Sequence, residues 1–113
     1  MLSRGWLFFP LLLGSMAGGL PARAADESFM GTNELTRLVR QDCGSCHGML
    51  LTGGLGQALV PEALREKSFD SLVATVLYGR PGTAMPAWKT ILSQRDAEWI
   101  VQKLISGFPE ETK

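Results

Sequence analysis

The run Cys43-Gly44-Ser45-Cys46-His47 is the stretch of this sequence whose residue types and spacing indicate chemistry. Residues three and four apart lie on one face of a helical turn, so the two thiols and the imidazole can face the same flat group. The C-x-x-C-H spacing is typical of covalent haem attachment, with thioethers from Cys43 and Cys46 and an iron bond from His47. The sequence therefore predicts one covalently bound haem c.

Other interpretations of the same residues explain less. A zinc site needs four protein ligands, or three and a water, and the whole sequence contains only two cysteines and one histidine. A thioredoxin-like C-x-x-C belongs in a βαβ context, and the sequence has no convincing strand pattern. A structural disulfide between Cys43 and Cys46 would leave the adjacent His47 without a role.

A methionine is the expected iron ligand on the face opposite His47. No second histidine exists, and methionine is a common partner of histidine in cytochromes c. Two of the five methionines lie near the N-terminus, and Met49 follows His47 too closely to cross the ring. Met30 remains an alternative, but Met85 precedes Pro86, whose fixed φ stiffens the chain. Met85 is the predicted ligand, although a methionine can also simply fill a gap in a core.

Four further residues are candidates for contacts with the haem. Leu55 and Leu59 belong to a glycine-rich loop and are expected to pack on its face or edge. Trp88 either donates its indole N–H to a propionate or closes the pocket as an aromatic wall. Arg80 either pairs with a propionate or is solvated. The sequence leaves the roles of Trp88 and Arg80 open.

The attachment run is expected at the C-terminal end of a helix that has Thr32 or Asn33 as its N-cap and ends near Gly48. Arg37 and Arg40 are placed on its outer side. The apolar residues of this helix recur at helical spacing: Leu35, Leu38 and Val39.

Three more helices are expected after the glycine-rich loop of residues 49–60. The first is short and begins at Pro61. The second has Ser68 as its N-cap and stops at Gly79. The third begins with a capping box at residues 93–96 and closes at Gly107. With no strand predicted, the fold class is all-α.

Residues 1–24 are predicted to be a cleaved signal peptide, which leaves residues 25–113 as one domain. Arg4 precedes an apolar stretch, and Ala22-Arg23-Ala24 matches an A-x-A cleavage site. An uncleaved membrane anchor is disfavoured, because the apolar run is short against the ~20 residues that a spanning helix needs and Pro10 interrupts it. Export to the bacterial periplasm suits the capture of two thiols by a haem.

Removing residues 1–24 takes away two arginines and no acid, which leaves nine basic and eleven acidic side chains and a net charge of −2. This balance argues against binding to nucleic acid or to an anionic membrane surface. The remaining chain of 89 residues is small for a self-sufficient core. A haem would supply the missing apolar contacts, so we expect the haem-free chain to be poorly folded.

The attachment run and the segment Gly-Arg-Pro-Gly-Thr-Ala-Met-Pro-Ala-Trp at residues 79–88 together resemble the class I small cytochromes c. Within them the chain is most similar to the cytochrome c-55X type encoded with cytochrome cd1 nitrite reductase. The resemblance implies a small fold around one haem, with N- and C-terminal helices packed together and His47 and Met85 as axial ligands. It also implies periplasmic electron transfer in denitrification, or a part in maturing the reductase's haem d1.

The predicted function is that of a one-electron carrier rather than an enzyme, with no catalytic residues of its own. Two occupied axial positions leave no iron site for a small substrate. A haem peroxidase or gas-binding protein, the enzyme-like alternative, would need an open distal site. A docking or maturation partner is the other alternative. The expected state is a monomer that is not inserted in a membrane and that meets redox partner proteins.

Overall fold

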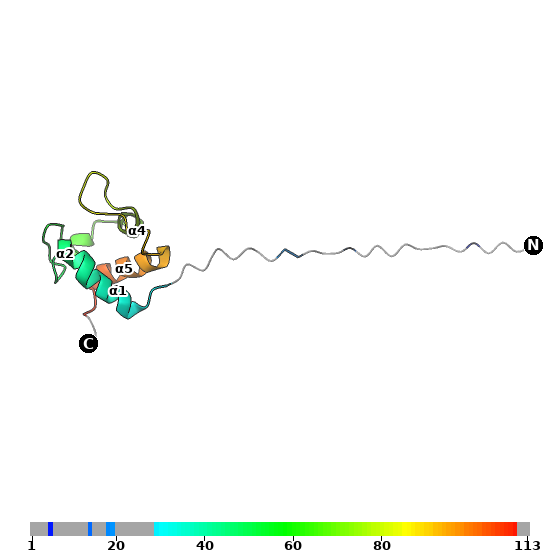
Figure 1. Ribbon diagram of the computed structural model, residues 1–113, viewed down its shortest axis with the longest axis horizontal. Coiled ribbons are helices and arrows are strands. Elements are labelled where there is room, and N and C mark those ends of the chain that lie inside the picture. The colour runs from blue at the N-terminus through cyan, green and yellow to red at the C-terminus, as the bar shows by residue number, and fades with distance from the viewer. Residues whose placement is uncertain (1–4, 6–13, 15–17, 20–28, 111–113) are drawn as a thin grey trace, which may run out of the picture.

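The computed structural model describes residues 5, 14, 18, 19 and 29–110 (Figure 1). It contains α1 (Thr32–Leu38), a π-helical turn η1 (Val39–Cys43), α2 (Gly44–His47), α3 (Pro61–Leu64), α4 (Phe69–Tyr78) and α5 (Gln94–Ser106). No strand occurs in these residues, which confirms the all-α prediction. The predicted signal peptide falls almost entirely outside the described residues.

α1, η1 and α2 follow one another without a break and carry the attachment run at their C-terminal end. The N-cap is Gly31, whose carbonyl accepts the Leu35 N–H at 2.9 Å, so the predicted start was one or two residues late. Thr32 is already helical, and the Thr36 hydroxyl donates to its carbonyl at 2.8 Å. The helix ends as predicted at Gly48, where φ is +90°.

The π-helical turn immediately before the attachment run was not predicted. The Gly44 N–H donates to the carbonyl of Val39, five residues earlier, instead of closing an α-helical bond. Such a widened turn shifts the angular position of every residue that follows it, and π-bulges are frequent at functional sites. Nothing in the spacing of the apolar residues indicates it.

Arg40 lies differently from the prediction. Arg37 is exposed on the outer side, as expected, but Arg40 is half-buried. Its guanidinium donates to the carbonyls of Phe108 at 3.1 Å and Pro109 at 2.9 Å and lies 5.4 Å from the centre of the Phe108 ring. A contact at 3.5 Å also joins it to the Met49 carbonyl. Arg40 therefore links the C-terminal tail to the attachment helix (α1, η1 and α2 together), because the N–H groups of one guanidinium donate to several carbonyls.

The caps of α4 and α5 confirm the sequence analysis. Ser68 accepts the Ser71 N–H, and Ser93 forms a reciprocal capping box with Asp96. Asp96 is buried, and it also accepts the Met30 N–H at 2.8 Å. The buried carboxylate thus accepts hydrogen bonds both from the N-cap of α5 and from the segment before α1.

The first and last helices pack against each other, as the family resemblance implies. Both contribute to one buried cluster, which also receives residues from the loops and from α3: Leu35, Val39, Leu51, Leu64, Leu92, Ile100 and Leu104. A second cluster lies between α4 and α5 and contains Val73, Leu77, Ala97 and Val101. Figure 1 shows α1 and α5 together, with the loop after α4 at the opposite edge. Within the described part of the chain, no helix has the length and apolar character needed to span a membrane.

Candidate haem-attachment site

The final turn of the attachment helix brings Cys43, Cys46 and His47 together. Cys46 is exposed, whereas Cys43 is half-buried and packs against the main core cluster. Burial raises the pKa of the Cys43 thiol to about 11, and the neighbouring Asp42 carboxylate adds to this shift. The two attachment points therefore differ: one faces the interior and the other faces solvent.

The His47 ring is held by a single backbone contact. Its Nδ1 lies 2.7 Å from the Gln57 carbonyl oxygen. Because a carbonyl only accepts, Nδ1 carries the proton, and the lone pair of Nε2 is left for a metal. Such a bond to the second ring nitrogen fixes the tautomer and orientation of a metal-bound histidine.

The glycine-rich loop fits closely around the attachment turn. Gly53 and Gly56 donate their N–H groups to the carbonyls of His47 and Cys46, each at 2.8 Å. A Cβ added at Gly56 would lie 2.7 Å from the His47 Nδ1 and Cε1 atoms, and one at Gly54 would lie 2.8 Å from the Cys46 carbonyl oxygen. The glycines are required here because the loop backbone approaches the ring and the helix end directly.

Met85 lies in a loop that closes on itself. Its carbonyl accepts the Arg80 N–H at 3.2 Å, and its own N–H donates to the Thr83 hydroxyl at 3.3 Å. The loop returns to α4 where the Trp88 N–H donates to the Val76 carbonyl at 3.2 Å. Met85 is half-buried. Its side chain therefore belongs to a segment whose backbone is held by these hydrogen bonds.

Two other predicted contact residues share a location. Leu59 and Trp88 are half-buried and pack against the same cluster as Cys43. Leu55, in contrast, is 95% exposed, and Arg80 is exposed as well. The structure thus brings Leu59 and Trp88, but not Leu55, to the core beside the attachment helix.

Met30, the alternative ligand, is held at both its backbone and its side chain. Its side chain packs against the main cluster, and its N–H is bonded to Asp96. This position places it with the start of α5. Ligation by Met85 rather than Met30 remains a prediction.

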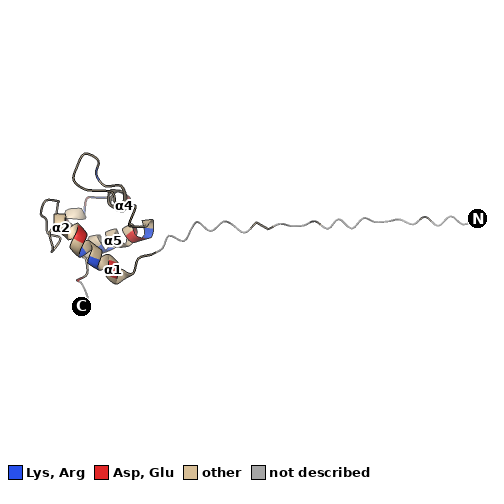
Figure 2. Cartoon of the chain, in the orientation of Figure 1, with Lys and Arg blue, Asp and Glu red and all other residues tan. Residues whose placement is uncertain are grey.

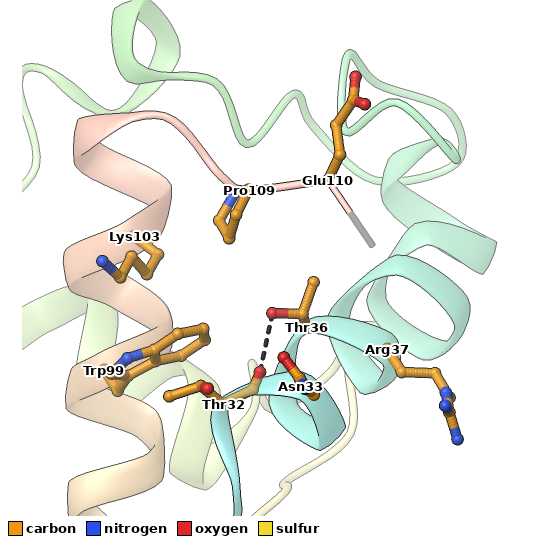
Figure 3. A pocket seen from close by; sticks show the side chains of 8 residues that line it. All are labelled: Thr32, Asn33, Thr36, Arg37, Trp99, Lys103, Pro109 and Glu110. Atoms are coloured by element: carbon orange, nitrogen blue, oxygen red, sulfur yellow. Dashed lines mark hydrogen bonds between the residues drawn. The ribbon is translucent and has the colours of Figure 1, made fainter. Parts of the chain in front are cut away.

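A depression of about 380 Å³ lies elsewhere on the molecule, between α1, α5 and the C-terminal tail. Figure 3 shows the eight residues that line it, among them Thr36, Trp99 and Lys103. None belongs to the attachment run or to the Met85 loop. The depression is therefore separate from the chemistry that the sequence predicts.

The residues present fit a covalently bound haem c. Two unpaired thiols and an oriented imidazole on one helical turn are the donor set for two thioethers and one iron bond. Among the described residues no group of three or more histidine, cysteine or acidic side chains could hold a bare metal ion.

Several residues at this site escaped the sequence analysis. Gln57 acts through its carbonyl, so its side chain gives no signal. Gly56 was noticed only as one of several loop glycines, and its specific contact with the His47 ring depends on the three-dimensional path. Thr83 and Gly79 shape the Met85 loop through backbone contacts that spacing does not reveal.

Comparison with known proteins agrees with this geometry. Residues 31–102 match the family model described as cytochrome C oxidase, cbb3-type, subunit III. Cytochrome c55X of Pseudomonas aeruginosa is 52% identical over 90% of this chain and 84% of its own length. Cytochrome c55X of Stutzerimonas stutzeri is 48% identical over 93% of this chain and 84% of its own length.

Two further likenesses concern the fold and a larger protein. The solved structure of the c-type cytochrome NirC is 64% identical, with a TM-score of 0.64, and the match covers 65% of this chain and 86% of NirC. Dihydro-heme d1 dehydrogenase of Pseudomonas aeruginosa is 33% identical over 89% of this chain but only 18% of its own length. The chain therefore belongs to the cytochrome c55X family of small c-type cytochromes, which carry one covalently bound haem c.

Proposed function

We propose that this chain carries single electrons between redox proteins, with His47 and Met85 as the axial ligands of its haem. The observation that carries this proposal is the His47 ring, oriented with one nitrogen left for a metal, and it is supported separately by the position of Met85 on a loop closed by its own hydrogen bonds. The haem supplies reversible one-electron chemistry at its iron.

The residues around the site provide orientation and exclusion of water rather than catalysis. Gln57 fixes the His47 ring, and Gly56 lets the loop lie against it. Leu59 and Trp88 pack on the core beside Cys43 and would exclude water from the haem. With both axial positions occupied no site is left for a substrate, so the chain is a carrier and not an enzyme.

The proposed setting is the periplasm, reached by means of a cleaved signal peptide at residues 1–24. The proposed acceptor is a cytochrome cd1 nitrite reductase, so that the chain serves denitrification as a monomer. Support comes from the resemblance to the cytochrome c-55X type and from the cytochrome c55X relatives.

A second candidate has one observation of its own. Dihydro-heme d1 dehydrogenase contains a segment similar to this chain, and a solved structure shows that protein in complex with DHE. A cytochrome of this type is therefore compatible with work on haem d1, and this chain would then exchange electrons with such a dehydrogenase during cofactor maturation.

Stopped-flow mixing of the haem-loaded protein separates the two candidates. Reduced protein is mixed with purified cd1 nitrite reductase, and oxidised protein is mixed with the dehydrogenase and its substrate. Rapid oxidation by the reductase supports the carrier in nitrite respiration, whereas rapid reduction by the dehydrogenase alone supports the maturation role. No measurable rate with either protein would contradict both.

A further inference from the structure

We propose that Thr83 is a positioning residue for the distal side: its hydroxyl holds the backbone around Met85 and controls how readily another ligand displaces the Met85 sulfur. The inference rests on the proposed His47–Met85 ligation. It concerns a side chain that does not itself contact the iron.

The hydroxyl of Thr83 connects the two ends of the loop. It donates to the Arg80 carbonyl at 2.6 Å and accepts the Met85 N–H at 3.3 Å. The Thr83 N–H donates to the same Arg80 carbonyl at 3.0 Å, and the Arg80 N–H donates to the Met85 carbonyl at 3.2 Å. Both backbone polar groups of Met85 thus form hydrogen bonds within the loop. The Met85 N–H depends on the Thr83 hydroxyl alone.

The ends of this loop are fixed independently of Thr83. Gly79 has a φ of +68°, and a Cβ added there would lie 2.6 Å from the Met85 carbonyl oxygen. On the far side, the N–H groups of Trp88 and Lys89 donate to carbonyls of α4 at 3.2 and 3.0 Å. Variation at Thr83 should therefore change the interior of the loop and leave its attachment to α4 intact.

Packing cannot substitute for the hydroxyl. Residues 81–84 are all exposed, so no buried apolar contact orders this part of the loop. Without the hydroxyl, the Met85 N–H would bond only to water and the Arg80 carbonyl would keep only the Thr83 N–H, so the loop would sample conformations in which the sulfur is withdrawn. Thr83 therefore acts on the lifetime of the sulfur–iron bond rather than on its existence.

The test uses the haem-loaded, oxidised protein and free imidazole as the probe. Imidazole nitrogen replaces the Met85 sulfur on the iron without a change of oxidation state, and the limiting rate at high imidazole reports how often the sulfur leaves. The Thr83→Val variant keeps the shape of the side chain and removes the hydroxyl, whereas Thr83→Ser keeps the hydroxyl. Thr90→Val removes an exposed hydroxyl for which the described structure shows no hydrogen bond.

We expect Thr83→Val to raise the limiting rate and the imidazole affinity by about 3- to 10-fold, the range that one lost hydrogen bond gives. The Thr83→Ser and Thr90→Val variants should match the wild type. Covalent haem content and the far-ultraviolet circular dichroism of each variant establish that it is folded and loaded, which keeps the comparison valid.

Two results would overturn the inference. If Thr83→Val exchanges like the wild type, or if Thr90→Val changes as much as Thr83→Val, the hydroxyl of Thr83 has no special position. Failure of the underlying ligation looks different: the wild type would then lack the absorption of a methionine–iron bond, and Met85→Ala would leave its spectrum unchanged.

Discussion

The loop that supports His47 and the loop that carries Met85, the proposed second ligand, are held in different ways. On the His47 side, residues 43–61 contain no charged side chain, and Figure 2 shows the loop beside α2 without blue or red. Its hydrogen bonds to the attachment turn all join backbone groups to one another or to the His47 ring. On the Met85 side, residues 79–92 carry Arg80 and Lys89 and no acid, and a threonine hydroxyl bridges the loop.

This difference follows from where each of the two proposed ligands lies in the chain. His47 is on a helix that is already rigid, so the loop only has to support the ring from outside, and backbone carbonyls suffice. Met85 is on the loop itself, which must therefore be stiffened from within. The histidine side is consequently tolerant of side-chain changes unless they add volume, while the methionine side depends on particular side chains.

The largest effect should come from Met85→Ala. The thioethers of Cys43 and Cys46 do not depend on the sixth ligand, so the haem stays attached while the distal side opens. We expect a lower reduction potential and new binding of carbon monoxide to the reduced form, measured by redox titration and absorption spectroscopy. Unchanged spectrum and potential would assign the ligand to Met30 or to an external group.

Gly56→Ala should be the most damaging small change on the histidine side. The added methyl group would lie 2.7 Å from the His47 ring, and overpacking of this kind typically costs about 1–3 kcal/mol. Denaturant unfolding of the haem-loaded protein measures the loss. Gly31→Ala is the control, because a Cβ at Gly31 meets nothing within 4 Å and its only expected cost is the loss of a glycine N-cap. Equal stability of the two variants would show that the loop does not press on the ring.

On the methionine side, Gly79→Ala and Gly82→Ala form a matched pair. Both glycines have positive φ, +68° and +78°, so each alanine carries a backbone penalty, and the penalty at Gly79 is the larger one because its ψ of −165° places it in a region that is essentially limited to glycine. Only the one at residue 79 would also contact the Met85 carbonyl. We expect Gly79→Ala alone to accelerate imidazole binding to the oxidised protein. Equal acceleration by both variants would mean that the backbone penalty, and not the contact, governs the loop.

Ala87→Glu tests whether the Met85 loop meets the electron acceptor. Ala87 is exposed. A carboxylate there would reduce the positive charge that Arg80 and Lys89 give to this loop. Electron transfer to the true acceptor should slow by about 3- to 10-fold at low salt and by less at high salt, because screening weakens exposed charges. The neutral variant Ala87→Gln is the control. A rate that Ala87→Glu leaves unchanged at both salt concentrations would exclude this surface from docking.

The smallest effect is expected for Gln57→Ala. The His47 ring is bonded to the Gln57 carbonyl, which alanine retains, and the Gln57 side chain is exposed. The unfolding free energy should stay within about 0.5 kcal/mol of the wild type, as for an ordinary surface change. The reduction potential should stay the same. A marked shift in potential would mean that the side chain, and not the backbone, supports the histidine.

The sequence predicted those features that depend on local residue types. The capping box at Ser93, the stop at Gly79 and the helix from Pro61 follow from the chemistry of single positions, and all are present. The π-helical turn was missed because the spacing of the apolar residues does not indicate it, and the inward position of Arg40 was missed because it depends on contacts with the distant C-terminal tail. Arg40 has the spacing of a surface residue until the C-terminal tail folds back over it.

The site shows the same limit. The attachment residues were identified because their spacing is itself the signal. The contacts of Gln57 and Gly56 with His47 were not, since one is a carbonyl and the other is the absence of a side chain. Contacts made by the backbone leave little trace in a single sequence, so the supporting shell of a ligand is harder to predict than the ligand.

The half-buried position of Cys43 has a consequence for the order of events during biogenesis. The cluster that covers this thiol includes Ile100 and Leu104, and Arg40 binds the carbonyls of residues 108 and 109. If the chain is exported from its N-terminus, as proposed above, both thiols are presented before the segment that encloses one of them has emerged. Because α5 lies late in the chain, the Cys43 thiol would stay accessible to an attachment machinery until α5 packs against the core.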